Sequence, residues 1–373
     1  MAQRIITPEG DYRGLDAWLS DTGCRRLMLV CGNSIRRQKA LVAKLEGLKQ
    51  GGLEILRFSD FEPNPRYESV VEGVRRFREA GCDGVMAVGG GSAMDVAKCV
   101  KLYCTLPGDG AEGGFLKQAI VANDIPFLAM PTTAGTGSEA TRFAVIYYQG
   151  QKQSVAHDSG VPGAVLLDPG CLKSLPEYQR KATMLDALCH AMESLWSVNS
   201  TPESMGYSRE AIRQVLAHMR GYLDNTDAGN AGMLLAANVA GKAINITQTT
   251  AGHAMCYKLT GLFGVSHGHA AVLCDRVLLP WNIENAAHCT DPRGEGHLRD
   301  ALSQLAGAMG CATPEAAARR LNGLFDTLGL EVPAATEEQY AQLRTSVNPV
   351  RLKNHPIALD EATIDMLYHR ILR

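Results

Sequence analysis

The sequence has no apolar run long enough to cross a bilayer, and no basic stretch beyond isolated pairs such as Arg36-Arg37. A membrane-spanning helix needs about 18 or more consecutive apolar residues, and nucleic acids are bound by clustered lysine and arginine. The 37 basic residues face 39 acidic ones, for a formal net charge of −2 over 373 residues. We therefore expect neither a membrane nor a nucleic acid as a partner.

Paired cysteines are also missing. The eleven cysteines are odd in number and form no C-x-x-C motif. This pattern argues against a disulfide framework and a cysteine zinc site, and is typical of buried small residues in a reducing compartment. The first residues, MAQRIITPEGDYRGL, lack the apolar core of a signal peptide. We expect a cytoplasmic protein.

The chain is longer than a single hydrophobic core usually becomes, so two domains are expected. Up to Pro176, short apolar strands alternate with amphipathic helices, which predicts a mostly parallel sheet covered on both faces. From residue 177 on, the segments are long, rich in Ala, Leu and Met, and helical in period. The predicted fold class is therefore α/β plus all-α, with domains at 1–176 and 177–373. The predicted strands are 26–32, 53–59, 84–91, 126–133 and 163–169, with helices at 40–50 and 68–81.

Two glycine-rich loops follow predicted strands. GGGSAMDVAK, residues 89–98, opens a predicted helix, where backbone N–H groups and the helix dipole favour a phosphate. It is not the G-x-G-x-x-G fingerprint, and a glycine run after a strand is often only a tight turn. PTTAGTGSEAT, residues 131–141, is the second loop. Because the carboxyl ends of parallel strands converge on one crevice, both loops can line the same dinucleotide.

Four candidate metal ligands lie in the second half: Asp186, His190, His253 and His267. Asp186 and His190 are four residues apart in DALCHAMES, so on a helix they project from one face. One carboxylate with three imidazoles suits Fe(II), Zn or a similar ion, and can leave a position open for a substrate oxygen. Taken singly, a D-x-x-x-H pair also arises by chance, and a lone histidine is commonly a buried or surface residue.

Together, GGGSAMDVAK, PTTAGTGSEAT, DALCHAMES and the histidines at 253 and 267 resemble the iron-containing, group III alcohol dehydrogenase family over essentially the whole chain. The separations of the four ligand positions, 4, 63 and 14 residues, also match that family. The resemblance implies an N-terminal Rossmann-like domain that binds NAD(P), and a C-terminal helical domain that holds Fe2+, or else Zn2+. It further implies an active site in the cleft between the domains. We expect a homodimer or a larger homo-oligomer.

The resemblance also implies cofactor-binding residues in both loops. Gly90, Gly91 and Ser92 would cradle the pyrophosphate, and Asp95 would face the cofactor. Lys152 falls near the family's cofactor-contacting lysine, although it could equally be solvent-exposed. The residues that would line the nicotinamide ribose, or else only shape the turn, are Thr132, Thr133, Thr136 and Ser138.

The chain departs from the family pattern after its first long strand. Many members carry an acidic residue there that binds the adenosine ribose hydroxyls, where this chain has Gly32. Loss of the carboxylate removes the repulsion of a 2′-phosphate. We therefore expect NADPH rather than NADH. The neighbouring residues that could hold the phosphate are Asn33, Ser34, Arg36 and Arg37.

A second departure lies four residues after His253, where well-known members have another histidine close to the nicotinamide. This chain has Tyr257. Position i+4 of a helix shares the face of His253, so the phenol could reach the site and serve as a catalytic group. A buried tyrosine is, however, commonly only part of the core.

Within the family, residues 178–204, 246–270 and 346–356 look like the phosphonoacetaldehyde reductases of phosphonate metabolism. The predicted function is therefore metal-dependent, NAD(P)H-linked reduction of phosphonoacetaldehyde to 2-hydroxyethylphosphonate. The alternatives are a reductase of lactaldehyde, succinic semialdehyde or butyraldehyde, and a dehydroquinate-synthase-like lyase. Arginine suits a forked contact with a phosphonate and lysine a point-charge contact, although each basic residue alone is commonly a solvated surface charge. The candidate substrate-binding residues are Arg142, Lys258, Arg351 and Lys353.

Overall fold

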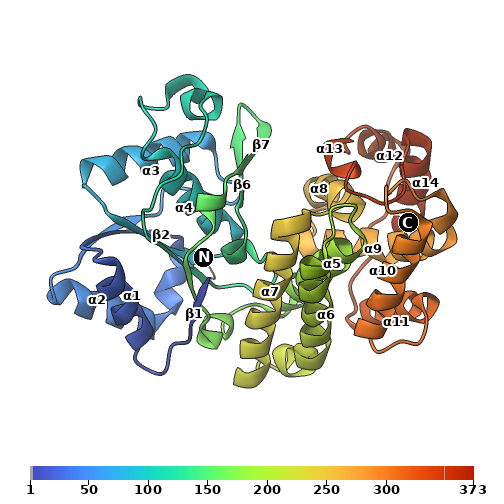
Figure 1. Cartoon of the computed structure of the whole chain (residues 1–373), viewed down its shortest axis with the longest axis horizontal. Coiled ribbons are helices and arrows are strands. Elements are labelled where there is room, and N and C mark those ends of the chain that lie inside the picture. The colour runs from blue at the N-terminus through green and yellow to red at the C-terminus, as the bar shows by residue number, and fades with distance from the viewer. Residues whose placement is uncertain (1–2, 348) are drawn as a thin grey trace. The chain divides into compact units, whose positions relative to one another are not determined.

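The computed structural model describes residues 3–347 and 349–373 and divides the chain into two compact units, Met1–Leu175 and Pro176–Arg373 (Figure 1). Among the described residues, every named strand lies in the first unit, and the second is built from helices. The predicted combination of an α/β part and an all-helical part is therefore confirmed. No helix in the described part of the chain is both long and apolar enough to span a bilayer.

The first unit contains a six-stranded parallel sheet, as the apolar runs predict. The chain runs from β2 outward to β3 and then returns to β4 on the other side of β2. This reversal is a topological switch point, and the crevice outside the carboxyl ends of β2 and β4 is where open α/β sheets bind ligands. The strand order is β1 (Arg4–Ile6), β8 (Ala164–Leu166), β5 (Phe127–Pro131), β4 (Gly84–Gly89), β2 (Arg26–Cys31) and β3 (Glu54–Phe58).

Helices cover both faces of this sheet (Figure 1). On one face, α1 (Arg13–Thr22) and α2 (Lys39–Gln50) bury residues such as Trp18 and Leu41 against the strands. On the other face lie α3 (Tyr67–Glu79) and α4 (Gly91–Tyr103). This double coverage explains why β4 and β5 are buried at every position and read as continuous apolar runs.

Some elements of the first unit were not predicted. The strand β1 is only three residues long, and β6 (Phe143–Tyr148) and β7 (Gln151–Ala156) form a separate antiparallel hairpin. The sequence of β7, QKQSVA, is mostly polar and has little apolar alternation. The hairpin turns at Gln149 and Gly150, both with positive φ, as in a type I′ turn, without the usual Asn-Gly signal.

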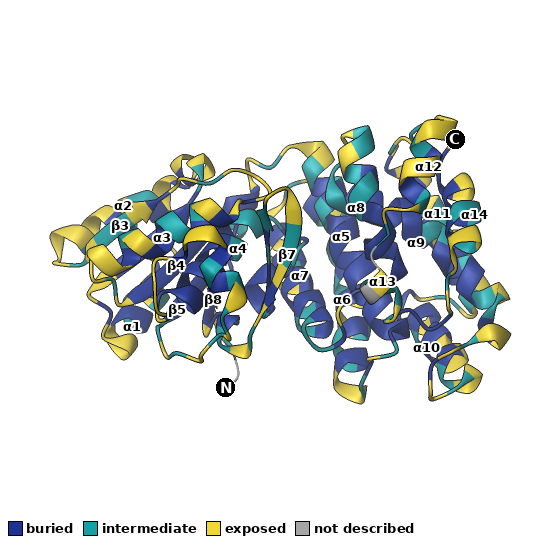
Figure 2. Ribbon diagram, turned by 90° about the horizontal axis from the view of Figure 1, so that it is seen from above, coloured by how far each residue is buried: buried dark blue, intermediate teal, exposed yellow. Residues whose placement is uncertain are grey.

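The second unit is organised around α5 (Glu177–Trp196), which packs against α6, α7 and α9. Figure 2 shows α5 and α9 mostly in the colour of buried residues. A helix that is buried on nearly all sides belongs at the centre of a helical domain. The remaining helices are α6 (Pro202–Leu223), α7 (Asp227–Thr247), α8 (Ala251–Phe263), α9 (His267–Glu284), α10 (Glu295–Ala308), α11 (Pro314–Thr327), α12 (Glu337–Arg344), α13 (Pro349–Leu352) and α14 (Glu361–Ile371).

Candidate metal centre and cofactor loops

Three helices of the second unit bring three of the four candidate ligands together. Asp186 comes from α5, His253 from α8 and His267 from the first position of α9. One ligand atom of each lies within 4.8 Å of the other two, and His253 Nε2 is 3.4 Å from Asp186 Oδ1. Asp186 and His253 are buried, while His267 is half-buried. This is a donor set that can hold a metal ion.

The fourth candidate, His190, lies one turn after Asp186 on α5. Its Nε2 atom is 4.0 Å from Asp186 Oδ1, and its ring stacks on that of His253 with the centroids 4.4 Å apart. The spacing of four residues therefore places Asp186 and His190 on one face of the helix. All four predicted side chains lie in one cluster.

Glu193 is a further carboxylate at this site, and the sequence did not point to it. It is fully buried on α5, and it accepts hydrogen bonds from Nδ1 and the backbone N–H of His253 and from the Thr250 hydroxyl. The bond at Nδ1 fixes the ring so that Nε2 faces Asp186, as metal-binding histidines require. The signal that could have revealed Glu193 is its position seven residues, or two turns, after Asp186.

The electrostatics of the cluster fit a divalent cation. Burial alone would raise the pKa of Asp186, but the imidazoles of His190, His253 and His267 bring it below its usual range. Burial would lower the pKa of His253, but Glu193 and Asp186 raise it to about 10. The buried carboxylates of Asp186 and Glu193 are therefore stabilised by positive charge placed between them. Carboxylate oxygen with imidazole nitrogen suits Fe, Zn or a similar ion.

Tyr257 lies beside this cluster on α8. Its ring centroid is 5.3 Å from that of His267, and the guanidinium carbon of Arg351, on α13, is 5.3 Å from the Tyr257 centroid. Arg351 Nη1 also donates to Thr249 Oγ1 at 2.7 Å. Burial raises the pKa of Tyr257. The positive charge of Arg351 lowers it, but by less than burial raises it. The phenol is therefore protonated at neutral pH, with a cation next to it.

The other candidate substrate-binding residues are placed differently. Lys258 follows Tyr257 on α8 and is half-buried, while Lys353 is exposed. Arg142 belongs to the first unit and pairs with Asp158 at 2.9 Å. Arg351 is the one placed by a direct contact beside the cluster, over the ring of Tyr257.

In the first unit, the two predicted cofactor loops touch each other. The backbone N–H of Thr132 donates to the Gly89 carbonyl at 2.9 Å. A Cβ at Gly90 would lie 3.6 Å from Thr133, and one at Gly91 would lie 3.6 Å from Thr136. The glycine backbone at the start of α4 therefore faces the second loop. The N-terminus of this helix, with Ser92 in its first turn, has the geometry that favours a phosphate.

The structure also gathers Asp95, Ser138 and Lys152. Ser138 Oγ donates to Asp95 Oδ1 at 3.4 Å. Burial raises the pKa of Asp95 to about 6, an effect that the charges of Lys98 and Lys152 oppose. Lys152, on β7, thus lies close enough to interact with Asp95 electrostatically, and the three predicted residues share one region of the unit.

Gly32 lies at the carboxyl end of β2, next to the switch point. The residues after it, Asn33 and Ser34, are exposed and begin a short 3-10 helix. A Cβ at Gly32 would meet no atom within 4 Å. Arg57, near the end of β3, lies 3.5 Å from the Gly32 carbonyl and is a further cation at this position that the sequence did not point to.

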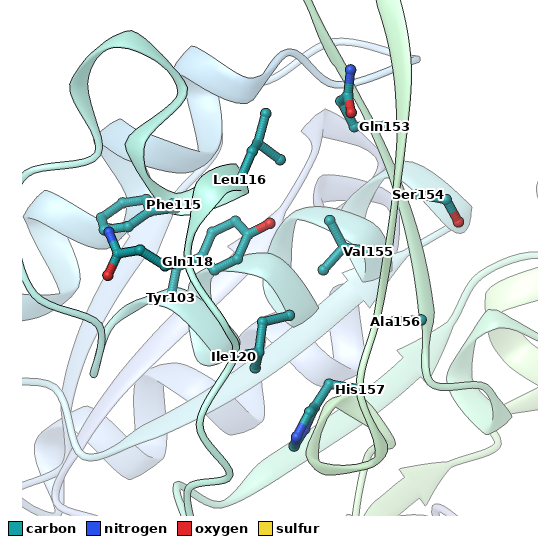
Figure 3. A pocket seen from close by; sticks show the side chains of 10 residues that line it. All are labelled: Tyr103, Phe115, Leu116, Gln118, Ile120, Gln153, Ser154, Val155, Ala156 and His157. Atoms are coloured by element: carbon teal, nitrogen blue, oxygen red, sulfur yellow. The ribbon is translucent and has the colours of Figure 1, made fainter.

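A pocket of about 320 Å3 lies elsewhere in the first unit (Figure 3). It is lined by the last residue of α4, Tyr103, by Phe115 and its neighbours, and by β7. None of the predicted cofactor residues lines it. Since Tyr103 and Gly91 are the opposite ends of α4, this pocket is separate from the glycine loops.

Comparison with known proteins identifies the family. Residues 2–169 match the model of the iron-containing alcohol dehydrogenases, and residues 181–372 match that of the C-terminal part of the Fe-containing alcohol dehydrogenase family. The phosphonoacetaldehyde reductase of Streptomyces viridochromogenes is 33% identical over 314 residues, which cover 80% of this chain and 79% of that protein. The choline dehydrogenase of Bacillus subtilis is 29% identical over 333 residues, 85% of this chain and 79% of that protein.

Among solved structures, a sulfoacetaldehyde reductase from Bifidobacterium kashiwanohense in complex with NAD+ superimposes with a TM-score of 0.85. It has 26% sequence identity and covers 99% of this chain and 96% of that one. The family models matched by both halves of the sequence, the two-part fold and the similar reductases all indicate the same family. The chain is an oxidoreductase that belongs to the iron-containing alcohol dehydrogenase family.

Proposed function

We propose that this protein is a metal-dependent, NADPH-linked reductase of a small anionic aldehyde, with phosphonoacetaldehyde as its substrate and 2-hydroxyethylphosphonate as the product. The observation that supports this substrate class best is the position of Arg351. Its guanidinium lies against Tyr257, which in turn lies against the candidate ligand His267. An anionic group bound at Arg351 would have its aldehyde end close to the metal cluster.

Asp186, His253 and His267, with His190 beside them, would hold the ion. We propose Fe2+, with Zn2+ as the alternative. Such an ion polarises a carbonyl as a Lewis acid, and a reduced nicotinamide is the hydride donor. Glu193 keeps His253 in the orientation and tautomer that ligation needs.

Tyr257 and Arg351 would act on the substrate. Burial raises the pKa of the Tyr257 phenol, so it keeps its proton at neutral pH and can donate it toward the oxygen on which charge develops. Arg351 offers a planar set of N–H donors that matches the oxygens of a phosphonate. Its bond to Thr249 and its stacking on Tyr257 hold it in place for that contact.

The similar proteins support an anion more than a cation. A phosphonoacetaldehyde reductase and a sulfoacetaldehyde reductase both act on a short aldehyde that carries an acidic group. Choline, the substrate in the name of another relative, is a cation. The guanidinium of Arg351 would repel a cation and attract the acidic aldehydes.

The cofactor preference rests on Gly32. A carboxylate at this position would repel a 2′-phosphate, and the open space beside Gly32 and the nearby Arg57 leave room and charge for one. We therefore propose NADPH as the preferred cofactor. A much higher catalytic efficiency with NADH would contradict this.

The test is the initial rate of NADPH and NADH oxidation, followed at 340 nm, with a panel of aldehydes. The panel is phosphonoacetaldehyde, sulfoacetaldehyde, succinic semialdehyde, lactaldehyde, butyraldehyde and betaine aldehyde. We expect phosphonoacetaldehyde to exceed the neutral and cationic aldehydes in kcat/KM by at least about tenfold, which corresponds to ~1.4 kcal/mol. A neutral or cationic aldehyde that reacts equally well would refute the assigned substrate class. The absence of any net absorbance change with every aldehyde would refute the reductase itself.

A further inference from the structure

Lys98 is a buried cation directly beneath the two cofactor loops. It lies on α4, seven residues after Gly91, and its side chain is fully buried. A buried ammonium group is costly unless its donors are satisfied. Its Nζ donates to Ser138 Oγ at 3.0 Å, to Thr141 Oγ1 at 3.0 Å and to the Phe143 carbonyl at 2.7 Å. All three donors of the ammonium group are thus used.

The three acceptors share one location in the chain. They belong to the end of the loop 131–141 and to the first residue of β6, which follows it. Lys98 itself belongs to the helix that the first glycine loop opens. The Lys98 side chain therefore connects α4, which follows the first loop, to the end of the second loop by hydrogen bonds. Ser138 is bound from both sides, since it accepts from Lys98 and donates to Asp95.

We propose that Lys98 is a positioning residue for the cofactor: it holds the second loop in the conformation that binds the dinucleotide, without touching the dinucleotide itself. This proposal rests on the assignment of the two loops to NAD(P)H. The helix α4 and the loop then form one rigid binding surface, so that the cofactor does not have to order the loop on binding. Loss of the ammonium group should weaken cofactor binding, while the metal cluster of the other unit keeps its ion.

Lys101 provides a matched control on the same helix. It is also buried, and its Nζ donates to the Asn123 carbonyl at 3.0 Å and to Asn123 Oδ1 at 2.8 Å, ahead of β5. Burial lowers the pKa of both lysines to about 8. Lys98→Met and Lys101→Met therefore remove the same kind of buried amine, but only the first removes contacts to the second loop.

The pH dependence separates positioning from a loss of stability. The titratable groups whose charges act on Lys98 are Asp95, Glu139 and Cys99. Tyr147 and Lys152 in turn interact with Asp95. Burial raises the pKa of Asp95 to about 6 and takes that of Cys99 above the range of the assay. When Lys98 loses its proton above about pH 8, its amine has two N–H donors for three acceptors. One of the three hydrogen bonds to the segment 138–143 is then lost. The dissociation constant of the wild-type protein should therefore rise above pH 8.

The experiment measures the dissociation constant of NADPH by fluorescence titration of the metal-loaded protein between pH 6.5 and 9, for wild type, Lys98→Met and Lys101→Met. We expect Lys98→Met to raise this constant at pH 7 by about tenfold or more, the effect of one hydrogen bond to a charged group. The further rise of the constant above pH 8, expected for the wild type, should be absent from this variant. Lys101→Met should match the wild type in both respects, and all three proteins should keep their metal.

Three results would overturn the proposal. Equal dissociation constants for the two variants at pH 7 would show that Lys98 contributes only stability. A rise above pH 8 that persists in Lys98→Met would assign the pH dependence to another group. If the wild type bound NADPH but reduced no aldehyde, the proposed function would fail while Lys98 kept its role. A wild type that bound neither NADPH nor NADH would refute both proposals.

Discussion

The two units of this protein build their sites in different ways. In the first unit, the proposed cofactor site is formed mainly by backbone N–H groups at the ends of parallel strands, and the side chains around them shape the loops. In the second unit, the candidate ligands are side chains from α5, α8 and α9 that meet at one point. A backbone site tolerates single side-chain changes better than a site in which each side chain supplies a ligand. Substitutions should therefore have larger effects on the metal cluster than on the cofactor loops.

The largest expected effect is that of His267→Ala. It removes one of the three converging ligands, so the protein should lose both its bound ion and its reductase activity. Metal analysis and the rate at 340 nm measure these losses. The dissociation constant of NADPH should stay the same, because the glycine loops are unchanged.

Exposed His288 offers a control for that substitution. His288→Ala should keep both the metal and the activity. Retention of the full metal content in His267→Ala would remove His267 from the ligand set.

Glu193→Gln tests whether the hydrogen bonds of Glu193 to His253 contribute to metal binding. The amide places an NH2 group where Glu193 accepts bonds from His253 and Thr250, so His253 loses its fixed orientation. We expect metal affinity to fall by about 10- to 100-fold, the usual cost of losing such a partner. Competition with a chelator measures the affinity. Glu203→Gln, an exposed change on α6, should leave it unaltered, and equal affinities in all three proteins would contradict the role of Glu193.

Arg351→Met should separate anionic from neutral substrates. The KM for phosphonoacetaldehyde should rise by about tenfold or more, as expected for a lost charged hydrogen bond. The KM for butyraldehyde should change little. Lys353→Met removes an exposed cation from the same stretch and serves as the control. If both aldehydes suffered equally from Arg351→Met, Arg351 would be a structural residue and not the anion site.

The smallest change is expected in the first unit, for Gly32→Asp. The new side chain has open space, so the fold should tolerate it. Its carboxylate would repel a 2′-phosphate and could accept bonds from ribose hydroxyls. We expect the ratio of kcat/KM for NADPH to that for NADH to fall by about tenfold, ~1.4 kcal/mol. An unchanged ratio would mean that the adenosine ribose binds away from Gly32.

The same difference between the units determines how much the sequence reveals. The central strands β2, β4 and β5 were predictable because burial on both faces makes them continuous apolar runs. The first loop was predictable because glycines directly follow β4. The hairpin of β6 and β7 was not, since the polar β7 lacks the expected alternation. Lys98 ends the motif GGGSAMDVAK, but its hydrogen-bond partners lie about 40 residues further along the chain, and only the fold brings them together.

In the second unit, helical periodicity predicted an all-helical domain and one local pair of ligand candidates, Asp186 and His190. The convergence of His253 and His267 on that pair depends on how α9 packs against both α5 and α8, which no local pattern encodes. The resemblance to a family supplied what spacing could not. Glu193 was missed because a buried carboxylate on an apolar helix shows its purpose only when its partners are in place.

The measurement that tests the account most directly is the rate of NADPH oxidation with phosphonoacetaldehyde, before and after removal of the metal with a chelator. We predict that the rate falls to background in the metal-free protein, that NADPH still binds, and that Fe2+ restores the rate. A metal-free protein that reduced the aldehyde at the original rate would contradict the assignment of Asp186, His190, His253 and His267 to a catalytic metal centre.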